Sequence, residues 1–304
     1  MPGDRAPVPS AAEIRRALGR ILLFLGLFIG LLWFGSLFLP AVFDKTGAGL
    51  LAGSALTLVA AVTAGMLPLT RLDRRPPGAL GFAWNRDALR ESARGLAIGL
   101  VAIAVAALLM AVTGGLGFHA APGSPAGWLK QAAWGFALLA VAAAAEEALF
   151  RGYAFQWLAR AAGPVAATIV ASGVFAAAHL QNPNADAFAV LNIFLAGVLL
   201  SVAYLRTRSL WFATAVHLGW NWGMASLLDL PVSGLEILDA PLYEPVIGGP
   251  QWLTGGAFGP EAGLAGTVAF VVALVAVLRL PGIETSRSMR ALGPIVDPEP
   301  MNAS

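Results

Sequence analysis

The sequence contains no cysteine. This absence excludes disulfides, thiolate zinc sites, cysteine nucleophiles and lipoprotein acylation together, and it leaves the redox compartment undefined. Charged residues are also scarce: they make up 12% of the 304 residues, whereas hydrophobic residues make up 58%. With a mean hydropathy of +0.75, the chain is too apolar for a soluble globular protein and too long for a single anchor. We therefore expect a polytopic membrane protein whose main partner is the lipid bilayer.

Nucleic acid is not an expected partner. The formal net charge is only +2, and the basic residues are spread over many short segments instead of gathering on one face.

Long apolar runs predict an all-α fold with about eight transmembrane helices. The first run is too long for a signal-peptide core and lacks a small-residue cleavage site, so it is read as an uncleaved span. The eight runs are 21–39, 50–69, 89–112, 128–158, 165–180, 188–205, 210–228 and 264–280. Two spacings of small residues, Gly26 with Gly30 and Gly95 with Gly99, are typical of close helix packing.

The arginines predict the orientation, because short cytoplasmic loops of membrane proteins hold most of the Lys and Arg. Eight spans place both termini on one side, and most basic residues fall on that side, which we take as cytoplasmic. These basic residues are Arg160, Arg206, Arg208 and those in segment 1–20 (for example Arg5), in loop 70–90 and in the tail 281–304. Only Lys45 and Lys130 fall outside, and the long outer segment 230–262 carries the acids Glu236, Asp239, Glu244 and Glu261 without a basic residue. We expect a multi-pass protein of the plasma membrane with both termini in the cytoplasm.

Two adjacent carboxylates, Glu146 and Glu147, interrupt the fourth apolar run. A carboxylate at that depth costs at least about 2.5 kcal/mol on insertion scales, so it marks a functional-site hypothesis. Arg151 lies four residues after Glu147, and this helical spacing allows an ion pair. Glu146 points about 100° away on the helix and is left free. We therefore expect Glu147 and Arg151 to support the structure and Glu146 to be the reactive carboxylate.

Two other apolar runs each carry one histidine. Phe175 and His179 are four residues apart, and so are His217 and Asn221. At about 1.5 Å per residue, both histidines and Glu146 lie roughly 12 to 21 Å from the cytoplasmic ends of their helices, so they can share one layer. The third histidine, His119, falls in an outer loop and is assigned no role.

These groups fit acyl transfer to water. Glu146 would act as general base on a water, His179 would orient that water, and His217 with Asn221 would stabilise the oxyanion. No serine with a matching base and no His-Glu-x-x-His motif is present, so a serine protease and a zincin are not supported. A zinc alternative stays open, since Glu146, His179 and His217 also match the ligand count of some catalytic zinc sites. A purely structural role of each polar group is the other alternative.

The three motifs together resemble those of the CAAX protease and bacteriocin-processing (CPBP, or Abi) family, which includes the type II CAAX prenyl endopeptidases. Glu146-Glu147-Ala-Leu-Phe-Arg151, Phe175-Ala-Ala-Ala-His179 and His217-Leu-Gly-Trp-Asn221 match the patterns EExxxR, FxxxH and HxxxN in order. The resemblance covers about residues 128–228. It implies a catalytic core there. The rest of the chain divides into a basic segment 1–20, helices and loops 21–127, an outer loop with the last helix 229–280, and a tail 281–304.

The resemblance implies an intramembrane endopeptidase that hydrolyses peptide bonds near the membrane, with water activated by the first glutamate. The family is often described as metal-dependent, whereas a reaction that uses Glu146 and an oxyanion donor requires no cofactor. Its partner would be a peptide or membrane-protein substrate. The alternative from another class is a non-proteolytic scaffold, immunity or regulatory protein of the same fold. The two differ in whether Glu146→Gln abolishes function while the protein stays folded.

Overall fold

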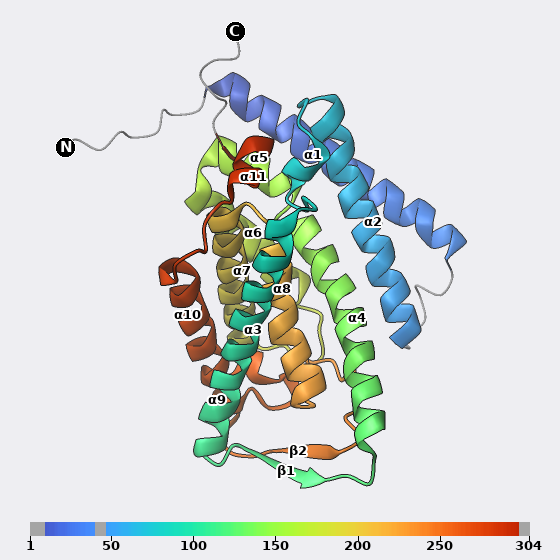
Figure 1. Ribbon diagram of the computed structural model, residues 1–304, viewed down its shortest axis with the longest axis vertical. Helices are drawn as coiled ribbons and strands as arrows, with labels where there is room; N and C mark the ends of the chain where they lie inside the picture. The colour runs from blue at the N-terminus through green and yellow to red at the C-terminus, as the bar shows by residue number, and fades with distance from the viewer. Residues whose placement is uncertain (1–9, 40–46, 298–304) are drawn as a thin grey trace, which may run out of the picture.

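The computed structural model describes residues 10–39 and 47–297, which form a helical bundle with a small two-stranded sheet at one end (Figure 1). The predicted positions of Arg5 and Lys45 lie outside the described residues. The α-helices are α1 (Ala11–Phe38), α2 (Gly47–Arg71), α3 (Arg86–Val112), α4 (Pro125–Phe150), α5 (Tyr153–Ala162), α6 (Pro164–Ala178), α7 (Ala187–Thr207), α8 (Leu210–Trp222), α9 (Gln251–Thr254), α10 (Leu264–Arg279) and α11 (Arg287–Leu292). The strands are β1 (Leu116–Ala120) and β2 (Tyr243–Ile247), and the short helical turns are η2 (Pro77–Leu80), η3 (Gly223–Leu227), η4 (Gly256–Phe258) and η5 (Pro260–Ala262).

Every predicted apolar run contains a helix, and the chain is a multi-pass membrane protein. Five helical segments are long and apolar enough to cross a membrane, namely α1, α2, α3, the segment from α4 through α5, and α7. Helices α6, α8 and α10 have 15, 13 and 16 residues, which is less than the roughly 20 residues of a typical span. The all-helical prediction is therefore largely confirmed, while the number of eight spans stays a prediction.

The fourth run is not one helix, contrary to the prediction for 128–158. Helix α4 ends at Phe150, and α5 begins at Tyr153 after a break at Arg151 and Gly152. A Cβ atom at Gly152 would lie 2.2 Å from the carbonyl oxygen of Ala148, so the backbone turns here in a way that requires glycine. Likewise, α8 ends at Trp222 and continues as the π-helical turn η3.

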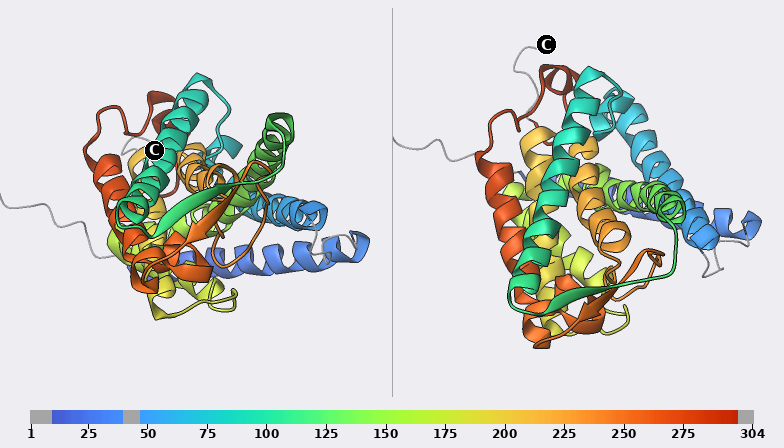
Figure 2. Two further views of the ribbon diagram at one scale, coloured as in Figure 1. Left: turned by 90° about the horizontal axis from the view of Figure 1, so that it is seen from below. Right: turned by 60° about the horizontal axis from the view of Figure 1, so that its bottom comes forward.

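Helix α8 lies in the centre of the bundle, against α3, α4 and α7. Its contact with α3 depends on glycines, because a Cβ at Gly95 or Gly99 would lie 2.5 or 2.2 Å from a carbonyl oxygen of α8. The Gly95/Gly99 spacing thus serves close helix packing, as predicted. Within the part of the chain that the structure describes, Gly26 and Gly30 on α1 have no such neighbour within 4 Å. In Figure 2, α1 and α2 lie at one side of the bundle and α10 at the opposite side.

The sheet joins two distant loops and was not predicted. Strand β1 pairs antiparallel with β2, with Leu116 opposite Ile247 and Ala120 opposite Tyr243. His119 lies exposed on β1. The sheet closes the end of the bundle opposite α5 and α11 (Figure 1).

Arginine contacts gather at the end that holds α5 and α11. Arg20 of α1 pairs with Asp73 after α2 at 2.8 Å. Arg208, between α7 and α8, pairs with Asp297 at 2.8 Å. The basic segments that were assigned to one side of the membrane therefore lie at one end of the fold, within the described residues.

Candidate active site

A cavity of about 830 Å³ lies between α2, α4, α6, α7, α8 and the segment that follows η3. Most of its lining is apolar, which is typical of a site that binds an organic ligand or peptide. Five of the predicted site residues line it: the four predicted catalytic residues Glu146, His179, His217 and Asn221, and Phe175. Three helices, α4, α8 and the end of α6, thus bring the predicted reactive groups to one space.

Glu147 and Arg151 form the predicted ion pair, and both side chains are completely buried. Arg151 Nη1 donates to Glu147 Oε1 at 3.1 Å, and Nη2 donates to the carbonyl oxygen of Gly197 on α7 at 3.1 Å. The guanidinium carbon also lies 4.6 Å from the centre of the Phe175 ring, which adds a cation–π contact. The pair therefore ties α4 to α7 and α6.

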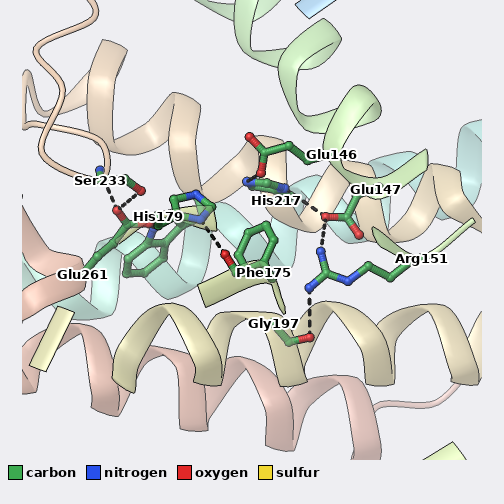
Figure 3. A network of polar contacts seen from close by, with 10 residues as sticks. Glu146, Glu147, Arg151, Phe175, His179, Gly197, His217, Ser233 and Glu261 are labelled. Carbon is green, nitrogen blue, oxygen red and sulfur yellow. Dashed lines mark hydrogen bonds and ion pairs between the residues drawn. The ribbon is translucent and has the colours of Figure 1, made fainter. Parts of the chain in front are cut away.

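His217 binds the same carboxylate, which the sequence did not indicate. Its Nδ1 lies 3.0 Å from Glu147 Oε1. Because a carboxylate accepts only, Nδ1 carries the proton in this contact, and this fixes the orientation of the ring. The other ring nitrogen, Nε2, lies 3.9 Å from Glu146 Oε2, beyond direct hydrogen-bond distance. Figure 3 shows the imidazole between the two carboxylates.

Glu146 differs from its neighbour in environment. Its side chain is 35% exposed toward the cavity, and its Oε2 atom is buried without a hydrogen-bond partner among the described residues. Glu147 Oε1, by contrast, accepts hydrogen bonds from two donors, Arg151 and His217. The predicted division into a paired and an available carboxylate therefore matches the geometry.

The His179 side chain is held by a backbone carbonyl of its own helix. It ends α6, and its Nδ1 lies 2.8 Å from the carbonyl oxygen of Phe175, which leaves Nε2 for another partner. The Phe175 ring lies 4.7 Å from the His179 ring and 6.2 Å from the His217 ring, between centres. Phe175 thus contacts both histidines and the arginine, and it supports the layer that the spacing predicted.

A zinc ion in a catalytic site needs about three side chains that converge on it. Among residues 10–39 and 47–297, no group of three or more His, Asp or Glu side chains is arranged to hold a metal ion. Glu146, His179 and His217 line one cavity without converging on one point. That the reaction requires no metal stays a prediction.

One buried carboxylate was missed. Glu261, placed by sequence among the acids of an outer loop, is 4% exposed and lines the cavity. It accepts hydrogen bonds from Trp220 and Ser233. No sequence signal separates Glu261 from Glu236 or Asp239, which also have apolar neighbours.

The part of the chain that carries the site matches a known protein family. Residues 127–223 match the family model "Type II CAAX prenyl endopeptidase Rce1-like", and all seven predicted site residues fall inside this range. No curated protein matches the chain. The match confirms the resemblance that the three motifs indicated: residues 127–223 are similar to the Rce1-like type II CAAX prenyl endopeptidase family.

Proposed function

We propose that the protein is a membrane-embedded endopeptidase in which Glu146 activates water to hydrolyse a peptide bond. The observation that carries this proposal is the contrast between the two adjacent carboxylates. Glu147 is buried and paired, whereas Glu146 faces a cavity of about 830 Å³ and has a buried oxygen without a partner among the described residues. The family is one of peptide hydrolases, which supports the same reaction class.

In the proposed reaction, the Glu146 carboxylate takes a proton from water while the water oxygen attacks the carbonyl carbon of the peptide bond. His179 Nε2 orients this water. The negative charge that develops on the carbonyl oxygen is stabilised by the Asn221 amide and by His217 Nε2–H. Glu146 then returns its proton to the leaving nitrogen as the C–N bond breaks, which regenerates the carboxylate.

In this scheme, Glu147 also balances the charge of a protonated His217. For His217 to donate from Nε2 while Nδ1–H stays with Glu147 at 3.0 Å, the ring must carry both protons. The buried Glu147 carboxylate lies where it can balance that charge. We assign Glu147, Arg151 and Phe175 to positioning the ring rather than to the reacting atoms.

The substrate is a peptide or membrane protein that enters this cavity. We place the arginine-bearing end of the fold in the cytoplasm and both termini on that side, on the basis of the positive-inside rule. The plasma membrane is the proposed location.

The test is Glu146→Gln, which preserves size but removes the base. We expect peptide cleavage to fall by about 100-fold or more, because a general base contributes roughly 10² to 10⁴, with unchanged thermal stability in detergent. Glu244→Gln is the matched control, since Glu244 lies exposed on β2 and away from the cavity lining. Peptidomics of membranes from cells that express each variant would identify cleaved products.

The alternative is a scaffold or regulatory protein that retains the polar cluster for stability. It predicts that Glu146→Gln and Glu147→Gln lower stability alike and that no peptide accumulates or disappears. That pattern would refute the endopeptidase proposal.

A further inference from the structure

We propose that Glu261 is a positioning residue that connects segment 232–237, which forms one wall of the cavity, to α8. It thereby sets the size of the substrate side chain that fits. Glu261 lies in η5, outside the residues that the family model matches. The inference rests on the proposed endopeptidase function.

The Glu261 carboxylate connects two parts of the chain. Trp220 Nε1 of α8 donates to Oε1 at 3.0 Å, and the backbone N–H and hydroxyl of Ser233 donate to Oε2 at 2.7 and 2.8 Å. All three residues line the cavity, and Figure 3 shows Glu261 beside Ser233. Since Glu261 is 4% exposed, these three donors replace water as its partners.

The network reaches both histidine-bearing helices. Trp220 lies between His217 and Asn221 on α8, and its ring packs at 4.5 Å on Phe270 of α10. On the other side, Asn182 Nδ2 donates to the carbonyl oxygen of Ser233 at 2.9 Å, and Asn182 follows His179 by three residues. A change in Glu261 would therefore move the wall relative to the reacting groups without touching them.

The wall itself is the segment 232–237 that follows η3 and its loop. Five of its residues line the cavity: Val232, Ser233, Leu235, Glu236 and Ile237. The segment makes a tight turn, in which Val232 N–H donates to the Leu235 carbonyl at 2.9 Å and Gly234 has φ of 81°. Apart from this turn, the side-chain bonds that hold Ser233 to the rest of the fold go to Glu261 and Asn182. The N–H of Gly234 also donates to the Phe258 carbonyl oxygen at 2.9 Å, so the wall is held by the Glu261 carboxylate together with Asn182 and Phe258.

The variant Glu261→Gln tests whether Glu261 positions the wall or only stabilises the fold. A glutamine places an amide NH₂ group against either the Trp220 or the Ser233 donors, so at least one buried hydrogen bond is lost. We expect KM for peptides with small residues to rise by about ten-fold, since a buried hydrogen bond to a carboxylate corresponds to about one decade in affinity. We expect kcat to stay within about three-fold, because Glu261 is not placed among the reacting atoms.

The assay uses purified protein and internally quenched peptides that carry Ala, Leu, Phe or Trp at each position of an otherwise constant sequence. In Glu261→Gln, the ratio of kcat/KM for Trp to that for Ala peptides should rise by about ten-fold at one position. Glu244→Gln should leave the ratio unchanged. Ser233→Ala and Trp220→Phe each remove one donor, and each should move the ratio in the same direction by about three-fold; they decide the question if Glu261→Gln does not fold.

An unchanged ratio in folded, active variants would overturn the positioning role and leave the endopeptidase proposal intact. A loss confined to kcat, with no change in side-chain preference, would overturn it as well. A wild-type protein that cleaves none of the peptides would refute the proposed function, and this inference with it.

Discussion

Removing the carboxylate of Glu147 should destabilise the protein more than any other conservative change in the site. In Glu147→Gln, the Arg151 guanidinium stays completely buried and keeps the Gly197 carbonyl oxygen at 3.1 Å, but it loses its counter-charge. His217 Nδ1–H and Arg151 then compete for one amide oxygen. Leaving one partner of a buried ion pair uncompensated costs about 3 to 5 kcal/mol.

The assay is thermal unfolding of the purified protein in detergent. A loss of that size should lower the apparent melting temperature by roughly 5 to 15 °C. Arg151→Met should produce a similar loss, because it leaves the Glu147 carboxylate buried. The double variant Glu147→Gln/Arg151→Met removes both charges, so it should recover much of the stability that each single variant loses. Glu244→Gln, an exposed carboxylate on β2, is the control.

Two results would refute this reasoning. If Glu147→Gln unfolded at the wild-type temperature, the ion pair would contribute nothing to stability. If the double variant lost the sum of the two single losses, the residues would not act as a pair.

Three further predictions concern topology, pH and metal. Because the chain has no cysteine, single cysteines at Trp84 and Ala120, which are both exposed, can be labelled directly; Trp84→Cys should react from the cytoplasmic side and Ala120→Cys from outside, and the reverse pattern would invert the topology. Burial, with nearby carboxylates, raises the pKa of Asp229, so its contribution to stability is present at low pH and is lost as pH rises above about 4. Asp229→Asn keeps an oxygen for the Ala240 N–H and should make the melting temperature less dependent on pH in this range; an unchanged pH profile would contradict it. Cleavage should survive dialysis against a strong chelator, while Asn221→Ala should lower kcat by about 10² to 10³ with little change in KM; loss on chelation with rescue by one equivalent of zinc would establish the metal alternative.

The positions of the helices and the pair on α4 could be predicted because both are local. An apolar run of membrane length specifies a helix wherever its partners lie. A spacing of four residues places Glu147 beside Arg151 on any helix, and the structure has this contact at 3.1 Å. The shared cavity was predicted by counting residues from the arginine-bearing ends, which worked because those ends lie together.

The remaining contacts are long-range, and no spacing encodes them. His217 contacts Glu147 across 70 residues of sequence, and the choice between Glu146 and Glu147 as its partner depends on how α8 packs against α4. Glu261 contacts Trp220 across 41 residues, from the segment 230–262 that the sequence placed outside the membrane. The strands β1 and β2 are five residues each, too short and too far apart for their pattern to show pairing.

The different environments of two adjacent glutamates depend on how the backbone ends α4. The N–H of Arg151 still donates to the carbonyl oxygen of Glu147 at 2.8 Å, and the chain then turns at Gly152, where a side chain would collide with the preceding turn. The Arg151 side chain reaches α7 at Gly197, where a Cβ atom would lie 2.9 Å from the backbone of α6. Glycine at that position lets α7 lie close to α6, so that its carbonyl oxygen meets the guanidinium. Arg151 is thereby fixed on Glu147, and Glu146, one residue earlier on the helix, is left facing the cavity.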